Sequence, residues 1–307
     1  MAQVLYEVIP LEANLRSRPA LEPGAVLTRL KQGQLVTALS PTPPAPKGWM
    51  RVRAEVQGTP VEGYVKAFLL RKAKQAVVPT PPSVLPNLPE AHLTPEGPIR
   101  RTGTASRAYP LQEPNQPGRP GPSPADRALQ LGKIIDYLNV EQSARYLPKG
   151  GQTFCNIYAH DYCHLAGAYL PRVWWRPKAL LRITAGEAVP VAYGTTVSEL
   201  NANSLYNWLE EFGPDFGWRR TLDLTELQNA ANMGQVALIC SQRTELNQPG
   251  HICAVVPETA EHKVPRRNGT VTTPLQSQAG ASNFRYGGRT WWTDTKRFAR
   301  FGFWAHA

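Results

Sequence analysis

The sequence is poor in cysteine, and it lacks a long hydrophobic run. Four Cys in 307 residues are too few for the disulfide framework that small secreted domains use in place of a large core. No apolar run approaches the ~20 residues that a membrane-spanning helix needs. The N-terminus also lacks the basic start and apolar stretch of a secretory signal. We therefore expect a protein that is made in the cytoplasm without a signal peptide and has no transmembrane segment.

Positive charge is abundant. The chain has 34 Lys and Arg against 23 Asp and Glu, a net charge of +11 that favours an anionic partner such as nucleic acid, a membrane surface or a cell-wall polymer. No nucleic-acid motif accompanies the basic stretches at 263–267 and 296–297, so we expect no nucleic-acid partner. Hydrophobic residues make up 42%, enough for a core.

Proline divides the chain. Residues 76–125 hold 13 of the 30 prolines, and such a segment cannot keep the hydrogen bonds of a helix or a sheet. We therefore predict an extended linker over 76–125, between an N-terminal unit at 1–75 and a larger domain at 126–307.

The N-terminal unit has the pattern of a small all-β barrel. Turn residues such as Pro23-Gly24 and Gly33 separate short apolar runs. Strands are expected at 4–9, 26–30, 34–39, 49–54 and 61–65.

The larger domain has the order of an α+β fold. Ser123 can cap a helix that starts at Pro124, with Asp126 placed to complete a capping box. Helices followed by an antiparallel sheet are typical of α+β proteins. Helices are expected at 124–140, 155–169, 197–212 and 224–233, and strands at 235–241, 251–256, 271–278 and 300–306.

Cys155 is the candidate nucleophile. It follows a loop containing Gly150-Gly151 and stands at the first turn of a predicted helix. Unpaired N–H groups and the positive end of the helix dipole favour a thiolate there. Because Cys163, Cys240 and Cys253 lie in apolar segments, we expect them to be core residues, with a Cys240–Cys253 disulfide as an open alternative.

His251 is the candidate general base, since it follows Pro249-Gly250 at the head of an apolar strand. A third residue must orient its imidazole, and we choose Gln278 on the next strand. Three other residues remain as alternatives for this role: Gln276, Asn283 and Glu258.

Two other clusters have competing interpretations. His160 and His164 are one helical turn apart, but zinc would need further ligands and no His-Glu-x-x-His motif is present, so no metal or cofactor is expected. Trp174 and Trp175 are candidates for a flat surface on which substrate packs, although most tryptophan side chains serve to fill the hydrophobic core. Asp161 is a candidate substrate-binding residue as well as a residue that holds the neighbouring loop.

Residues 130–307 resemble the papain-like cell-wall amidohydrolases called NlpC-type and CHAP, and residues 1–74 resemble a bacterial SH3-like domain. Where the commonest NlpC pattern has Asp-Cys-Ser-Gly, this chain has Phe154-Cys155-Asn156-Ile157. The resemblance is carried by Thr153-Phe154-Cys155-Asn156-Ile157-Tyr158, Pro249-Gly250-His251-Ile252 and Gln278-Ala279-Gly280-Ala281-Ser282-Asn283.

The resemblance implies a papain-like cysteine hydrolase that cuts an amide bond of peptidoglycan without a metal. Cys155 would attack the carbonyl, and Tyr146 and Asn156 would help to shape the substrate site. The SH3-like module would bind the wall or act as a spacer. A monomeric lysin or an antibacterial effector fits, the latter with secretion machinery and an immunity protein as partners. The alternatives are a deamidase or acyltransferase acting on a host protein, and a non-catalytic scaffold.

Overall fold

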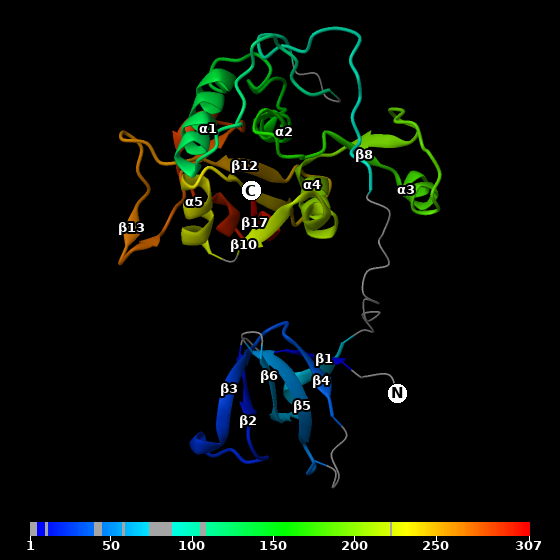
Figure 1. The fold of residues 1–307 in the computed structure, drawn as a ribbon, viewed down its shortest axis with the longest axis vertical. Coiled ribbons are helices and arrows are strands. Elements are labelled where there is room, and N and C mark those ends of the chain that lie inside the picture. The colour runs from blue at the N-terminus through cyan, green and yellow to red at the C-terminus, as the bar shows by residue number, and fades with distance from the viewer. Residues whose placement is uncertain are drawn as a thin grey trace. The chain divides into compact units, whose positions relative to one another are not determined.

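The structure, a computed structural model, describes residues 5–9, 12–39, 45–56, 59–73, 88–104, 109–221 and 223–307. The chain forms two compact units, residues 1–84 and 85–307 (Figure 1). Over the described ranges, no helix is long and apolar enough to cross a bilayer.

The first unit is one curled antiparallel sheet. Its strand order is β3-β2-β6-β5-β4-β1-β7. In β5 the side chains of Val52 and Ala54 are buried, while those of Arg51 and Arg53 alternate toward solvent, the two-residue period of a sheet with one dry face. The strands are β1 Leu5–Val8, β2 Glu12–Arg16, β3 Val26–Lys31, β4 Leu35–Ala38, β5 Trp49–Val56, β6 Thr59–Lys66 and β7 Leu70–Lys72.

All five strands expected in this unit are present. The structure has two more, β2 and β7, that the sequence did not predict. In β2 only Ala13, Leu15 and Arg16 are buried, and β7 is three residues long with only Leu70 buried. Segments of three to five residues are too short for their pattern to predict a strand, because their strand state depends on the neighbours with which they pair.

The second unit is built on a six-stranded antiparallel sheet of order β10-β17-β11-β12-β15-β16. Two smaller two-stranded pairs lie apart from it. The large sheet comprises β10 Trp218–Thr221, β11 Val236–Arg243, β12 His251–Val255, β15 Gln276–Gln278, β16 Phe284–Gly287 and β17 Phe298–His306, and the small pairs are β8 Val173–Trp175 with β9 Val197–Glu199, and β13 Arg266–Arg267 with β14 Thr270–Val271.

Five α-helices lie in the described part of this unit. The predicted capping box at Ser123 and Asp126 is present. The helices are α1 Pro124–Leu138, α2 Cys155–Leu165, α3 Pro177–Thr184, α4 Ala202–Glu211 and α5 Leu224–Asn232.

Two predicted helix boundaries were wrong. The helix from Cys155 ends at Leu165 rather than 169, because Gly167 takes a positive φ of 73° there. The third expected helix begins at Ala202 rather than 197, because the Asn201 side chain caps it. Residues 197–199 pair with β8 instead.

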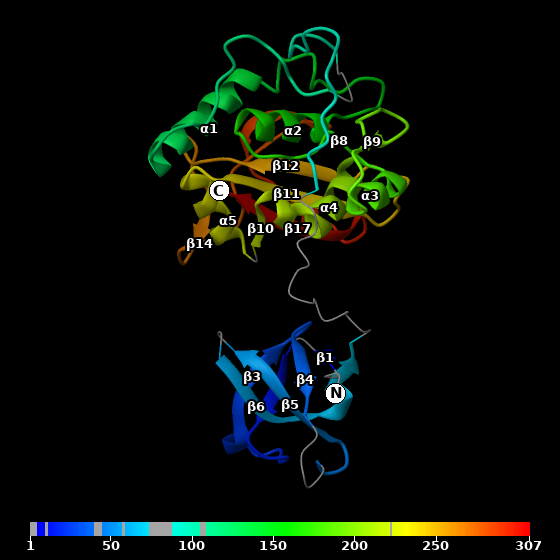
Figure 2. The same ribbon diagram turned by 45° about the vertical axis from the view of Figure 1, so that its right-hand side comes forward.

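The two faces of the large sheet are covered by different helices. Leu238 of β11 and Ala254 of β12 belong to the core that contains α1, α2 and α4, whereas Ile239 and Val255 pack with Leu227 of α5. Figures 1 and 2 show α2 and α5 on opposite sides of β12. The alternation of β-strand side chains thus divides the interior into two layers.

The same alternation excludes the Cys240–Cys253 disulfide. Cys240 lies in the core on the α2 side, whereas Cys253 lies in the core on the α5 side. Side chains on opposite faces of a sheet cannot reach the separation that a disulfide requires. All four cysteines are free.

The predicted linker is wrong for part of its length. The Ala91 N–H donates to the Tyr169 hydroxyl at 2.8 Å, and the Trp175 indole donates to the Pro89 carbonyl at 2.8 Å. Described residues from 88 to 123 therefore pack on the second unit. Over its described residues this segment forms no helix or strand, and side chains of the domain satisfy part of its backbone. Residues 76–87 and 105–108 lie outside the described residues.

Candidate active site

A tight turn leads the chain into α2. Lys149 and Gln152 exchange both backbone hydrogen bonds, at 3.1 and 3.0 Å, across Gly150 and Gly151. Both glycines have positive φ, 58° and 76°, as a type I′ turn requires. The glycines that preceded the candidate nucleophile in the sequence thus reverse the chain just before the helix.

Cys155 is the first residue of α2, and no side chain caps that end of the helix. Phe154 occupies the cap position without a side-chain hydrogen bond, and the first helical bond runs from the Tyr158 N–H to the Phe154 carbonyl. The N–H groups of the first turn therefore remain open beside the sulfur. Open N–H groups at the positive end of a helix suit an oxyanion or a thiolate.

The Cys155 thiol is almost wholly buried, with 5% of the residue exposed. Burial raises the pKa of this thiol, and the backbone N–H groups of Ile252, Asn156 and Cys155 partly oppose that rise. Because burial outweighs the N–H groups, the resting sulfur is the neutral thiol. A neighbouring base is needed to remove its proton.

His251 is the first residue of β12, and a glutamine holds its ring. The Nε2 atom of His251 lies 2.8 Å from Oε1 of Gln278, whose Nε2 donates to the Ser282 carbonyl at 3.1 Å. The second bond orients the Gln278 amide so that its oxygen faces the imidazole. Nε2 of His251 is therefore the protonated nitrogen, which leaves Nδ1 free to accept a proton.

The surroundings of His251 keep its ring uncharged. Its ring lies against Trp291, edge to face, with centroids 4.5 Å apart. Burial lowers the pKa of His251 to about 4, with further lowering from Arg297 and Arg243, and the Gln278 hydrogen bond opposes this. A neutral imidazole at pH 7 is the form that can act as a base.

The backbone of β12 contacts the Cys155 sulfur next to His251 in the sequence. The Ile252 N–H that approaches the Cys155 sulfur belongs to the residue that follows His251. Both lie in the described part of the chain, and there no hydrogen bond joins the thiol to the imidazole. Catalytic hydrogen bonds are often long in unliganded enzymes and tighten when substrate binds.

A cleft of about 420 Å³ opens beside Cys155. It is bordered by the turn before α2, by the start of α4 and by the residues just before β12. Only two charged side chains line it. The lining residues are Gly151, Gln152, Thr153, Phe154, Cys155, Asn156, Ile157, Arg172, Glu199, Asn201, Ala202, Pro249 and Gly250.

Asn156 alone of the five predicted substrate-binding residues lines this cleft. Its side-chain amide also donates to the Leu200 carbonyl at 2.9 Å. Asn156 therefore ties the start of α2 to the chain between β9 and α4, which forms another wall of the cleft.

The predicted substrate roles of Asp161 and Tyr146 are not supported, because both are wholly buried. The Asp161 carboxylate accepts from Arg145 at 2.6 Å, from the Tyr146 hydroxyl at 3.0 Å and from the Leu111 N–H at 3.1 Å. Each of its oxygens is thus bonded within the protein. The interpretation of Asp161 as a residue that holds the neighbouring loop agrees with these contacts.

The flat surface predicted at Trp174 and Trp175 is also absent from the cleft. Trp174 packs edge to face on Trp208, with centroids 5.5 Å apart, and on Phe216. Trp175 bonds the Pro89 carbonyl. Both are about 5% exposed or less, so their role is packing rather than substrate contact.

The three alternatives to Gln278 all lie in other hydrogen-bond networks. Gln276 accepts from the Trp291 indole at 3.0 Å, and Asn283 donates to the Val140 carbonyl at 2.8 Å. Glu258 pairs with Arg266. Of the four candidates, Gln278 is the one that contacts His251.

The histidine pair on α2 does not form a metal centre. His160 bonds the Leu170 carbonyl through Nδ1 and stacks on His164 with centroids 5.9 Å apart. Burial lowers the pKa of His160 well below its usual value. Over the described ranges, no three metal-ligating side chains come together.

Sequence reasoning missed Arg172 and Glu199, the charged pair in the cleft wall. Arg172 immediately precedes β8, and Glu199 ends the paired strand β9. The only signal available was a charged residue placed directly before an apolar strand. That signal is weak, because most such residues are solvated.

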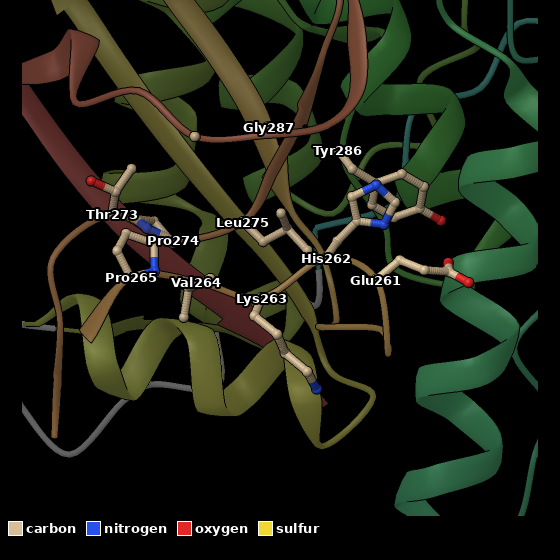
Figure 3. Close-up of a pocket in the computed structure, with 11 residues that line it drawn as sticks. Glu261, His262, Lys263, Val264, Pro265, Thr273, Pro274, Leu275, Tyr286 and Gly287 are labelled. Atoms are coloured by element: carbon tan, nitrogen blue, oxygen red, sulfur yellow. The ribbon is translucent and has the colours of Figure 1, made fainter.

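A second hollow, of about 250 Å³, lies away from Cys155. Figure 3 shows the stacked rings of His262 and Tyr286 in its wall, near Leu275. No cysteine or serine lines it. It therefore offers no nucleophile comparable to Cys155.

Comparison with known proteins does not identify a family for this chain. No protein-family model matches the chain, and no curated protein matches it. NlpC2 from Trichomonas vaginalis is similar at 10% identity and a TM-score of 0.19, over 98% of this chain and 73% of that one. NlpC1 from the same organism is similar at 10% identity and a TM-score of 0.21, over 97% and 68%. Scores this low establish no common fold.

Proposed function

We propose that this protein is a cysteine hydrolase that cuts an amide bond of peptidoglycan. In this proposal the second unit is a papain-like catalytic domain and the first is an SH3-like module that binds the wall. One observation carries the proposal: a buried cysteine opens an uncapped helix at a cleft, against a strand whose first residue is a histidine with its tautomer held by Gln278.

The arrangement supports a complete reaction cycle. Nδ1 of His251 takes the proton from Cys155 as the sulfur attacks the amide carbonyl. The N–H groups at the start of α2 stabilise the oxyanion, an effect worth about 3 kcal/mol per donor. The intermediate then expels the amine, which takes the proton from His251. Water, deprotonated by the same imidazole, hydrolyses the thioester and restores the thiol.

The choice of peptidoglycan rests on the sequence resemblance and on charge. A net charge of +11 suits an anionic wall polymer. The protein would act at the bacterial cell wall, as a monomer, after release as a lysin or after delivery by a secretion machine. A delivered toxin would need an immunity protein in the producing cell.

Mass spectrometry of soluble fragments from purified sacculi tests the proposal. Wild type should release muropeptides, and both Cys155→Ala and His251→Ala should release none. Cys163→Ala is the matched control, because Cys163 lies on the same helix, is wholly buried and does not line the cleft. Its products should equal those of wild type.

Two results would contradict parts of the proposal. Fragments from His251→Ala at the wild-type rate would mean that another residue is the base. If wild type releases no fragments although a thiol-reactive probe labels Cys155, the substrate is not peptidoglycan, and a protein substrate would have to be sought. The probe is informative because the other three cysteines are wholly buried.

A further inference from the structure

The cleft beside Cys155 contains a buried cation without hydrogen bonds. Arg172 is 3% exposed, yet Nε, Nη1 and Nη2 all lack a hydrogen-bond partner among the described residues. The carboxylate of Glu199 is 3.9 Å from Nη2, too far for a hydrogen bond. A guanidinium has five N–H donors, and burying them unbonded is costly.

Arg145, the other buried arginine in the described part of this unit, makes the hydrogen bonds that Arg172 lacks. Arg145 is also wholly buried, but it donates to both oxygens of Asp161, at 2.6 and 3.3 Å, and to the Tyr109 carbonyl at 3.0 Å. Burial without hydrogen bonds therefore distinguishes Arg172 from Arg145. A group left in this state within a cleft wall is suited to a ligand that supplies the missing acceptors.

Arg172 keeps its charge despite burial. Burial lowers its pKa to about 10, while Glu199 and Asp161 oppose that change and Arg145 adds to it. His160 also has a buried nitrogen without a hydrogen-bond partner among the described residues, and its pKa is lowered by burial and by Arg172, so it stays neutral. At neutral pH the cleft thus presents a guanidinium cation rather than an imidazolium.

The position of Arg172 relative to the nucleophile is held by the backbone. The Leu200 N–H donates to the Arg172 carbonyl at 3.2 Å, and the Leu200 carbonyl accepts from the Asn156 side chain at 2.9 Å. Asn156 follows Cys155 directly. Two hydrogen bonds therefore connect the cation to the start of α2, and a substrate anion bound to Arg172 would be held in register with the sulfur.

We propose that Arg172 binds a carboxylate of the substrate next to the amide bond that Cys155 attacks. A guanidinium matches a carboxylate with two parallel hydrogen bonds. Glu199, whose Oε1 accepts from the Tyr193 hydroxyl at 3.3 Å, disfavours a dianion such as phosphate. This inference rests on the proposed function and narrows it to stem peptides with a free carboxylate beside the scissile bond.

The test compares a muropeptide that has free carboxyl groups with the same muropeptide after methylamidation of those groups. Binding is measured by calorimetry on the Cys155→Ala protein, so that no turnover is needed. Wild-type Arg172 should favour the free acid by ~10- to 100-fold, the strength typical of a hydrogen bond to a charged group. Adding Arg172→Gln should reduce the preference to within about threefold.

Further variants keep the result interpretable. Arg172→Lys retains a positive charge but not the paired N–H donors of the guanidinium, so it should keep part of the preference for the free acid. Arg176→Gln is the matched control, because it changes an exposed arginine at the other end of β8 and should leave the preference intact. Thermal melting of every variant establishes that it is folded.

Each outcome decides a different question. An acid preference that survives Arg172→Gln overturns the inference but leaves the proposed hydrolase standing, provided that the catalytic protein cleaves sacculi. Equal binding of acid and methylamide by Arg172 protein also overturns it. If neither muropeptide binds and no sacculus is cleaved, the proposed function fails together with the inference.

Discussion

At Asp161, in the middle of α2, a buried arginine, a tyrosine hydroxyl and a backbone N–H all meet one carboxylate. At Cys155, where the same helix begins, the first turn is uncapped and Arg172 in the cleft wall has no hydrogen-bond partner among the described residues. One region satisfies its buried charge and the other does not. The difference separates scaffold from site, because the cost of an unsatisfied polar group is tolerated where a ligand can remove it.

The largest expected effect comes from breaking the satisfied region. Asp161→Ala leaves the buried Arg145 without its carboxylate partner, so the free energy of unfolding should fall by about 3–5 kcal/mol. Arg172→Met removes a guanidinium that makes no hydrogen bond among the described residues and only a long ion pair with Glu199, so it should not destabilise the fold. Chemical denaturation of both variants measures the contrast. A loss of under about 1 kcal/mol in Asp161→Ala would mean that the buried pair adds little stability beyond an exposed one.

The next effect concerns the pH dependence of the reaction. His251 works as a base only when neutral, so activity is lost as the pH falls through its pKa, which burial lowers to about 4. The acidic limb of kcat/KM should therefore lie near pH 4 rather than at the ordinary histidine value of about 6.5. A pH profile on soluble muropeptides measures this. A limb at the ordinary value would show that water reaches the imidazole in solution.

The smallest effect is expected in the first unit, where charges are paired on the surface. Glu62 contacts Arg53 at 2.6 Å, but both side chains are more than a third exposed. Water and salt screen such a pair, so Glu62→Gln should leave the melting temperature unchanged. Differential scanning calorimetry of the whole chain checks this. A clear drop in the transition of the first unit would show that surface pairs matter to this sheet.

Local patterns predicted much of the fold. The capping box at Ser123 and most of the expected strands depend on residues close in sequence, and the structure contains them. The strand expected at 271–278 is wrong, because this segment is divided between β14 and β15, which belong to different sheets. The missed strands and the helix α3 are short, and their states depend on partners far along the chain. The segment 88–123 was assigned to a linker for the same reason: its proline content is local, but the side chains that satisfy its backbone are not.

The candidate site also has residues that local sequence predicted and residues that only the tertiary structure placed. Glycine before a cysteine at a helix start, glycine before a histidine at a strand head and a glutamine on the next strand are local features, so the sequence alone sufficed to nominate Cys155, His251 and Gln278. Which polar side chains face the cleft was decided by tertiary structure. Asp161 became buried scaffold and Arg172 a wall of the cleft, because the pairing of a buried charge depends on which distant segments meet in space.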